Sequence, residues 1–255
     1  MKASERRARI LDLLSERGAV RAAELAEIFG VSEVTVRKDL ARLEAEGLLK
    51  RVHGGAVARP RSLFNPSFEE KRHHRIQQKK AIAREALKRI EENDAILLDA
   101  GTTTLALAQL LKQNFNKLFI VTNALPIALE LSGSPFEILL TGGTVRHHSG
   151  ALIGPAAVAT LEGITVDKAF LGATGVSLEK GYTTPNPIEA QTKREMVRAA
   201  RTRIALVDSS KLGRATLARF AKLEEVNELI TDADAPPEFV SAFKQKGLNL
   251  TLVQV

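Results

Sequence analysis

The sequence has 255 residues, which is long enough for one or two domains with buried cores and excludes a peptide or a disulfide-stapled miniprotein. It carries 37 Lys and Arg against 30 Asp and Glu, a formal net charge of +7, which favours an acidic partner. Residues 1–90 contribute 21 basic and 12 acidic side chains, whereas residues 91–255 contribute 16 and 18. The positive charge therefore belongs to the N-terminal third of the chain.

Cysteine is absent, which excludes disulfides, thiolate metal sites and cysteine nucleophiles and is typical of a reducing cytosol. Apolar runs such as 95–98 and 118–121 are far shorter than the roughly 20 residues that a membrane span needs. The first residues are rich in arginine and lack the apolar stretch of a secretory signal. We therefore expect a cytoplasmic protein with no membrane partner.

The first 58 residues predict three short helices followed by a hairpin. The second and third helices are joined by a short turn that contains Gly30. Ser32 is placed to cap the third helix, and Gly47 follows that helix at a position typical of a helix stop. Residues 48–57 indicate two strands joined by a Gly-Gly turn, so the order is that of a helix-turn-helix with a wing. The apolar residues at helical spacing are Ile10, Leu13, Leu14, Leu25, Ile28, Phe29, Val36, Leu40 and Leu43.

A plain three-helix bundle with a solvated charged face is the alternative to DNA binding. The third helix favours DNA, because its outward side combines short hydroxyl donors with long cationic donors. Such a helix can reach base edges while neighbouring cations hold phosphates. The residues that we expect to contact DNA lie on this helix and on the wing: Ser32, Thr35, Arg37, Lys38, Arg51 and His53.

A breaker-rich stretch at 60–66 predicts a linker. The next segment, 68–92, carries an apolar stripe at helical spacing and predicts one helix that packs on the second domain. Its outer face is basic, and an ordinary solvated face and direct DNA contact are equal alternatives for it. We expect a DNA-binding domain at 1–58, a linker at 59–74 and a second domain at 75–255.

From residue 93 onward, short apolar strands alternate with helices. This pattern predicts an α/β fold with a mostly parallel sheet covered on both faces. The expected strands lie near 95–99, 118–122, 137–141, 168–172, 203–208, 227–231 and 248–253. The expected helices lie near 103–113, 124–132, 155–162, 187–201 and 236–246.

Polar residues and glycines follow five of these strands, at the edge where open α/β sheets bind ligands. The turn at 101–104, Gly-Thr-Thr-Thr, enters a helix, so its N–H groups and hydroxyls are placed to bind a phosphate. Lys211 would add a cation, while Asp99 and Asn123 would bind sugar hydroxyls. In the alternative, the aspartates only cap strand ends and the glycines only make turns.

Five such loops on one rim favour a small phosphorylated ligand over that structural alternative. The residues that we expect to contact it are Asp99, Gly101, Thr102, Thr103, Asn123, Gly142, Gly143, Lys193 and Lys211.

We expect no metal and no cofactor. The pairs His73-His74 and His147-His148 have diverging side chains and no carboxylate or further histidine at ligand spacing. Gly142-Gly143 lacks the rest of a dinucleotide fingerprint, and no Gly-Lys-Thr phosphate loop occurs.

The sequence resembles the DeoR-type transcriptional regulators over essentially its whole length. The motifs that carry the resemblance are 31–40, 43–47, 51–56, 98–103, 121–123, 141–143, 167–172 and 208–211. The resemblance implies a winged helix-turn-helix that binds operator DNA as a homo-oligomer, a dimer or tetramer, and represses sugar-utilisation genes. It also implies a sensor domain similar to ribose-5-phosphate isomerase, which releases DNA when a phosphorylated sugar or polyol binds.

That similarity raises an alternative, a sugar-phosphate isomerase with a DNA-binding appendage. Isomerisation requires a carboxylate base, and the related isomerases carry an acidic run after the fourth strand. Here the matching loop, 172–176, contains no acid, whereas 208–211 keeps the pattern in which Lys211 resembles a phosphate ligand. Asp99, Glu179 and Glu189 remain acids near the rim. The sequence therefore favours a sensor without catalytic residues.

Overall fold

A computed structural model describes residues 3–46, 48–58 and 67–255 of the protein. The chain divides into two compact units, Met1–His74 and Arg75–Val255, each with its own hydrophobic core. The expected linker stretch 60–66 and the expected helix stop at Gly47 lie outside the described residues.

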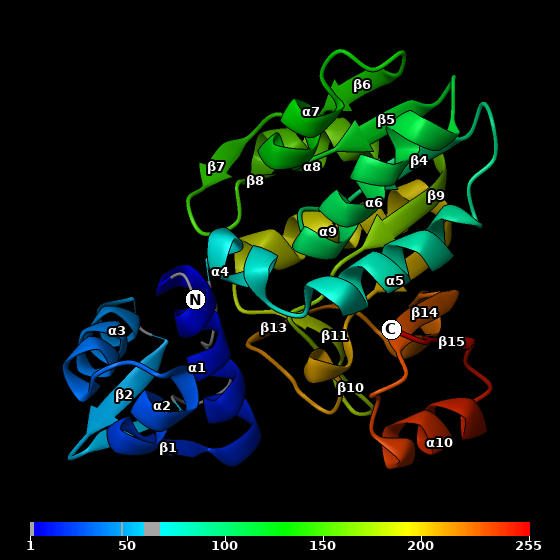
Figure 1. Ribbon diagram of the computed structural model, residues 1–255. Coiled ribbons are helices and arrows are strands. Elements are labelled where there is room, and N and C mark those ends of the chain that lie inside the picture. The colour runs from blue at the N-terminus through cyan, green and yellow to red at the C-terminus, as the bar shows by residue number, and fades with distance from the viewer. Residues whose placement is uncertain (1–2, 47, 59–66) are drawn as a thin grey trace. The chain divides into compact units, whose positions relative to one another are not determined.

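The N-terminal unit is a winged helix-turn-helix, as the sequence predicted (Figure 1). Its core contains the predicted Ile10, Leu25, Val36 and Leu40, but Ile28 is about half exposed. Its elements are α1 (Ala3–Arg17), β1 (Ala19–Arg21), α2 (Ala22–Phe29), α3 (Glu33–Ala45), β2 (Leu49–Val52), β3 (Gly55–Ala58) and α4 (Phe68–His73).

The turn between α2 and α3 has the predicted chemistry. Gly30 ends α2 in the left-handed conformation, with a φ of 63°. The Ser32 hydroxyl accepts a hydrogen bond from the Thr35 N–H at 3.2 Å and so caps α3. These two residues fix where the second helix stops and where the third begins.

The wing is part of a three-stranded antiparallel sheet with the order β1-β3-β2. The sequence did not predict β1, because three residues carry no readable alternation. A Cβ on Gly55 would overlap the carbonyl oxygen of Val20 in β1, so a glycine is needed where these strands meet.

The predicted single helix over 68–92 is wrong. The structure has two helices, α4 and α5 (Ile76–Leu87), separated at Arg75, whose φ of 48° is left-handed. α4 begins with a capping box between Ser67 and Glu70 and packs on α1 in the N-terminal unit. α5 packs on α6 (Thr102–Asn114) and β14 (Glu228–Asp232) in the C-terminal unit. The predicted apolar stripe belongs to α5, whereas α4 contains one apolar residue, Phe68, and its buried residue is Glu70.

The C-terminal unit is built on the predicted parallel sheet. Its seven strands lie in the order β15-β14-β12-β9-β4-β5-β6, and every neighbouring pair is parallel. The central strand β4 is a continuous apolar run, and β9 ends in one at 169–171, as expected of strands covered on both faces. The strands are β4 (Ala95–Leu98), β5 (Phe119–Thr122), β6 (Glu137–Leu140), β9 (Val166–Leu171), β12 (Ala200–Leu206), β14 and β15 (Leu250–Val253).

The order in which the chain adds strands to the sheet reverses between β4 and β9. From β4 it proceeds to β5 and β6 on one side, and from β9 it proceeds to β12, β14 and β15 on the other. Ligands of open α/β sheets bind at such a switch point, beyond the carboxyl ends of the strands. The remaining helices are α7 (Leu125–Leu131), α8 (Pro155–Glu162), α9 (Pro187–Ala199), α10 (Pro237–Gln245) and the short η2 (Ser209–Lys211) and η3 (Leu223–Glu225).

Two small antiparallel sheets were not predicted, because their strands have only three or four residues. One is the hairpin of β7 (Thr144–Arg146) and β8 (Ala151–Ile153). The other has the order β10-β11-β13 and consists of β10 (Gly175–Ser177), β11 (Gly181–Thr184) and β13 (Ala218–Ala221).

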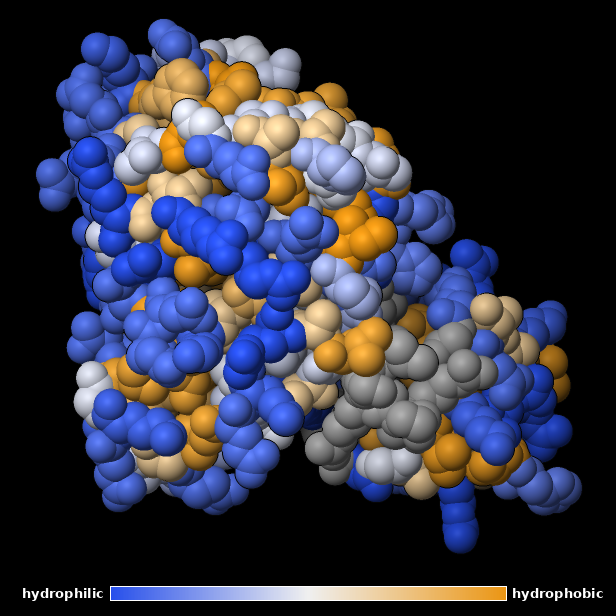
Figure 2. Space-filling model, turned by 180° about the vertical axis from the view of Figure 1, so that it is seen from behind, coloured by the Kyte–Doolittle hydropathy of each residue, from blue (hydrophilic) through white to orange (hydrophobic). Residues whose placement is uncertain are grey.

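Hydrophilic residues cover most of the face seen in Figure 2, with hydrophobic patches between them. Across the described ranges, no helix has the length and apolar character to cross a membrane.

Candidate functional site

Asp99 and Gly172 meet at the switch point of the sheet. Asp99 follows β4, Gly172 follows β9, and these two strands are neighbours. The Asp99 side chain is fully buried, and its Oδ2 accepts a hydrogen bond of 2.8 Å from the Gly172 N–H. The two central strands therefore hold the first polar groups of the rim together.

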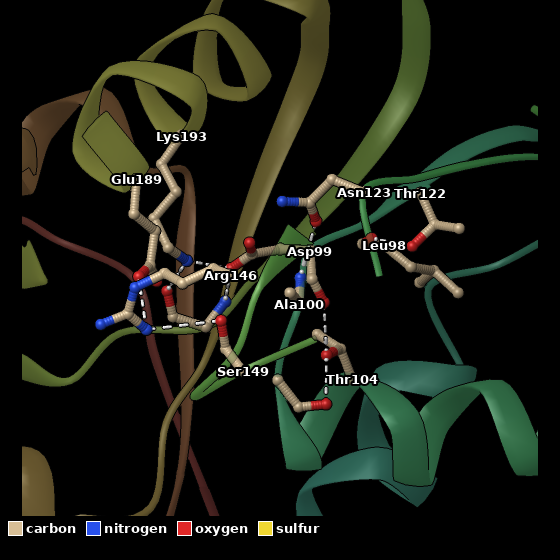
Figure 3. A network of polar contacts seen from close by, with 12 residues as sticks. Leu98, Asp99, Ala100, Thr104, Thr122, Asn123, Arg146, Ser149, Glu189 and Lys193 are labelled. Carbon is tan, nitrogen blue, oxygen red and sulfur yellow. Dashed lines mark hydrogen bonds and ion pairs between the residues drawn. The ribbon is translucent and has the colours of Figure 1, made fainter. Parts of the chain in front are cut away.

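Lys193 reaches Asp99 from α9 and forms an ion pair with its Oδ2 (Figure 3). The Lys193 ammonium also donates to the Gly172 carbonyl oxygen at 2.9 Å and lies 4.9 Å from the centre of the Phe220 ring. Burial raises the pKa of Asp99, and Lys193 opposes this shift by favouring the charged carboxylate. Lys193, an expected ligand contact, is thus the buried partner of Asp99.

The turn after Asp99 forms the start of α6, as predicted. Gly101 is the N-cap, and no side-chain cap hydrogen bond is made there by the described residues. The Thr104 hydroxyl donates to the carbonyl oxygens of Asp99 at 2.6 Å and Gly101 at 2.9 Å, which fixes the turn. Thr102 is half-buried and Thr103 is buried. An uncapped helix start of this kind suits an anion.

Asn123 uses both ends of its amide inside the protein. Its Oδ1 accepts from the Ala100 N–H at 2.9 Å, and its Nδ2 donates to the Leu152 carbonyl oxygen at 3.1 Å. The residue is 1% exposed. Each end of the Asn123 amide thus has a partner that holds the residue in place, while the amide keeps a second N–H and a second lone pair. The expected contact with sugar hydroxyls stays a prediction.

Gly142 and Gly143 follow β6 and lead into the β7–β8 hairpin. Both are exposed and both have positive φ, 71° and 113°. A Cβ on Gly143 would lie 2.7 Å from the carbonyl oxygen of Ile153. Gly143 therefore sets the close approach of the hairpin to the rim, whereas Gly142 has open space around it.

Lys211 lies at the end of η2, on the loop that follows β12. The loop is anchored by a hydrogen bond of 2.7 Å from the Ser209 N–H to Asp232 Oδ2 and by one of 2.6 Å from Arg75 to the Ser209 hydroxyl. Lys211 is half-buried, and its ammonium forms no ion pair with the described residues. The loop thus holds a cation that no carboxylate in the described part of the chain neutralises.

Sequence reasoning missed Arg146 as a rim residue. Its guanidinium, on β7, lies 3.3 Å from Glu189 Oε2 on α9 and 3.4 Å from the Ser149 hydroxyl (Figure 3). Its side chain is 15% exposed. Its closeness in sequence to Gly143, three residues before it, was a usable signal. Because the β7–β8 hairpin was not predicted, Arg146 could not be placed in the fold.

Two buried carboxylate oxygens of the rim, Asp99 Oδ1 and Glu189 Oε2, receive no hydrogen bond from the described residues. An unsatisfied buried acceptor costs about 1 to 3 kcal/mol. The rim can therefore accept hydrogen bonds from a ligand that carries hydroxyl groups.

In the N-terminal unit, the six predicted DNA contacts lie on α3 and on the β2–β3 wing. All are exposed except Thr35, which is half-buried. Arg37 forms an ion pair of 3.0 Å with Glu33 on the same exposed side of the helix. The neighbouring Val34, which the sequence did not single out, is 62% exposed. This surface offers hydroxyl, cationic and apolar groups together.

Asp39 fixes the orientation of α3. It is buried and lies 2.6 Å from Arg6 and 3.6 Å from Arg7, both on α1. Sequence reasoning missed this contact, although Asp39 lies three residues after Val36 and four before Leu43, on the helix face that is buried.

Within the described ranges, no group of three or more His, Asp or Glu side chains could hold a metal ion. The rings of His147 and His148 meet edge to face, 5.7 Å between centres, and His74 pairs with Asp12.

Two family models match the chain, a DeoR-like helix-turn-helix domain at residues 6–61 and a DeoR C-terminal sensor domain at residues 74–233. The chain belongs to the DeoR family of transcriptional regulators. This confirms the resemblance on which the sequence interpretation rested.

Curated members of the DeoR family match almost the full chain. The HTH-type transcriptional regulator GlpR of Haloferax volcanii is 37% identical over 95% of this chain and 96% of its own length. The glycerol-3-phosphate regulon repressor of Escherichia coli K12 is 32% identical over 99% and 100%. Among solved structures, a D-ribose-5-phosphate isomerase in complex with phospho-erythronic acid is 23% identical, with a TM-score of 0.41 over 54% of each chain.

Proposed function

We propose that this DeoR-family regulator is a cytoplasmic repressor of sugar-utilisation genes that a phosphorylated sugar or polyol releases from its operator. One observation carries the proposal: the rim at the switch point combines an uncapped helix start with a buried carboxylate oxygen, Asp99 Oδ1, that has no donor in the described part of the chain. Such a rim suits a ligand with a phosphate and hydroxyls. The relative named as a glycerol-3-phosphate regulon repressor supports this ligand class.

DNA binding is assigned to the N-terminal unit. α3 enters the major groove, where Ser32, Thr35 and Arg37 meet base edges and Lys38 holds a phosphate. Val34 adds an apolar contact of the kind that thymine methyl groups make. Arg51 and His53 on the wing follow the DNA backbone.

The domain boundaries proposed from the sequence are 1–58, 59–74 and 75–255. The division of the structure at His74 and Arg75 supports the last of these boundaries. α4 packs on α1, so part of the proposed linker belongs to the N-terminal unit.

The effector is assigned to the rim of the C-terminal unit. Its phosphate binds the N–H groups at Gly101, Thr102 and Thr103 together with the Lys211 ammonium. Its hydroxyls donate to Asp99 Oδ1, while Lys193 keeps that carboxylate charged and in place. Asn123, Gly142 and Gly143 shape the rim.

The regulator acts as a homo-oligomer, a dimer or tetramer, because paired helix-turn-helix units read two half-sites. Effector binding stabilises a state in which the two units no longer match the half-sites, since a ligand shifts an equilibrium only by its differential affinity.

An isomerase is the second candidate, because Asp99 and Glu189 remain acids at the rim. A sensor is favoured, since both acids are held by cations and the loop 172–176 has no acid. Incubation with pentose, hexose and triose phosphates, followed by NMR, separates the two: a sensor gives no turnover, and conversion of any of them would overturn this part of the proposal.

Thermal unfolding with a panel of free and phosphorylated sugars and polyols tests the ligand class. A ligand at 100 times its Kd stabilises the folded protein by about 2.7 kcal/mol. We expect stabilisation by a phosphorylated compound and none by its free counterpart. A flat response to the whole panel would contradict the proposal.

A further inference from the structure

Three cations line the rim or its approach, and their contacts differ. The Lys193 ammonium has three partners within the protein: Asp99, the Gly172 carbonyl oxygen and the Phe220 ring. Lys211 has no ion pair with the described residues. Arg146 stands between these extremes, because among the residues that the structure describes its guanidinium contacts only Glu189 and Ser149.

The contacts of Arg146 are long for a charged pair. Its Nη1 lies 3.3 Å from Glu189 Oε2 and 3.4 Å from Ser149 Oγ, whereas charge-assisted hydrogen bonds are about 2.7 to 2.9 Å. Glu189 Oε2 still receives no hydrogen bond from the described residues. The pair is therefore electrostatic but poorly satisfied on both sides.

The backbone around Arg146 is held on one side only. β8 is tied to β5 through the hydrogen bonds between Asn123 and Leu152. β7 pairs with β8 and with no other strand among the described residues, and Thr144 and Val145 are exposed. Arg146 can therefore change partners without disturbing the main sheet.

We propose that Arg146 is an effector-binding residue and that Glu189 is its internal substitute for a ligand anion. An anionic oxygen group of the effector, a phosphate or a carboxylate, replaces Glu189 at the guanidinium and forms the shorter bonds that Glu189 does not. This inference rests on the proposed effector site. It identifies Arg146 as the residue from which the ligand displaces Glu189.

In the unliganded protein, the two ion pairs keep the local charge in balance. Asp99 is paired with Lys193 and Glu189 with Arg146, so the charges of these four side chains sum to zero. An incoming anion pairs with Arg146 and leaves Glu189 free to accept the hydroxyl hydrogens of the same ligand. The rim thus favours a ligand that carries both an anion and hydroxyl groups.

Isothermal titration calorimetry on the full chain tests the exchange. The probes are orthophosphate, glycerol 3-phosphate, fructose 1,6-bisphosphate and 6-phosphogluconate, which carry one phosphate, two phosphates, or a phosphate and a carboxylate. Arg146→Ala should weaken every probe that the wild type binds by about tenfold or more, which corresponds to about 1.4 kcal/mol. A loss confined to the two-anion probes assigns Arg146 to the second anion, and an equal loss for all assigns it to the phosphate.

Glu189→Gln removes the internal competitor and keeps the shape of the side chain. We expect this variant to bind the probes about threefold or more tightly than the wild type. Unchanged or weaker binding would overturn the exchange.

The double variant Arg146→Ala/Glu189→Gln separates loss of the cation from repulsion by an unpaired Glu189. The double variant should bind the probes more weakly than the wild type, as Arg146→Ala does. Recovery of wild-type affinity would show that Arg146 does not bind the ligand. Arg201→Ala is the matched control, because its pair with Asp167 is exposed and its affinity should not change. Thermal unfolding without ligand checks that each variant is folded.

The two proposals fail in different ways. If the wild type binds a probe and Arg146→Ala binds it equally well, this inference fails and the proposed function stands. If the wild type binds none of the four probes or the wider sugar panel, the proposed effector site fails and the inference with it.

Discussion

The Lys193 ammonium and the Asp99 carboxylate form a buried ion pair at the switch point of the parallel sheet. Removing one partner would leave the other charge buried without compensation. Lys193→Met should therefore destabilise the C-terminal unit by about 3 to 5 kcal/mol, measured by urea unfolding followed by circular dichroism.

Two controls isolate the buried pair. The double variant Asp99→Asn/Lys193→Met removes both charges and should recover most of the lost stability. Arg201→Met breaks the exposed pair with Asp167 and should change stability by less than about 1 kcal/mol. Equal losses for Lys193→Met and Arg201→Met would contradict the assignment.

Tyr182 on β11 is 1% exposed, and its hydroxyl has no hydrogen-bond partner among the described residues. Tyr182→Phe removes this unsatisfied group, so it should leave stability at pH 7 unchanged or raise it by about 1 kcal/mol. A loss of more than about 2 kcal/mol in urea unfolding would show that the hydroxyl has a partner, such as an ordered water.

Burial also raises the pKa of Tyr182. The folded protein then keeps the phenol neutral at pH values where the unfolded chain loses the proton, that is, above about pH 10. This contribution to stability is full below pH 10 and is lost as the pH rises further. Between pH 9 and pH 10.5, the free energy of unfolding in urea should fall less for Tyr182→Phe than for the wild type. Equal decreases would refute the raised pKa of Tyr182.

Arg37 is expected to meet a base edge, and its pair with Glu33 is exposed. Arg37→Ala should weaken binding to a selected operator by about 1 to 3 kcal/mol and relax specificity at one position. Lys38→Ala, the matched control on the same helix, should weaken all duplexes alike and lower the salt slope by about 1. Fluorescence anisotropy at several salt concentrations measures both. Unchanged affinity of Arg37→Ala would remove this residue from the interface.

Ser32 caps α3, and we propose that it also contacts DNA. Ser32→Ala should destabilise the N-terminal unit by about 1 kcal/mol, whereas Ser32→Asp keeps a capping acceptor. If Ser32 also touches DNA, Ser32→Asp should stay as stable as the wild type and still lose operator affinity, because its carboxylate repels phosphate. Wild-type affinity of Ser32→Asp would leave Ser32 with the capping role alone.

The sequence predicted those parts of the fold that depend on long, repeated patterns. The seven parallel strands and the helices between them follow from apolar runs, and α3 follows from Ser32 and its inward-facing residues. The break at Arg75 could not be predicted, because it depends on a left-handed arginine, with no glycine or proline beside it to mark the end of α4. Strands of three residues, such as β7, are too short for any alternation to be read.

The sequence predicted where the candidate site lies, but not which of its side chains pair with one another. Asp99, Gly101 and Lys211 were predicted to lie on the rim because each follows a strand in the sequence. The sequence could not say that Lys193 would be taken by Asp99, or that both ends of the Asn123 amide would be used, since those contacts depend on where α9 and β8 pack. Arg146 was missed for the same reason.

Effector-dependent release of DNA tests the central claim most directly. A labelled operator duplex, selected by this protein from a random library, is bound to the wild type and to Lys211→Ala, and phosphorylated sugars and polyols are titrated while anisotropy is followed. The account predicts that one phosphorylated compound releases DNA from the wild type, and that Lys211→Ala binds the operator equally well but is not released. No release from the wild type by any phosphorylated compound, or a normal release of Lys211→Ala, would contradict it.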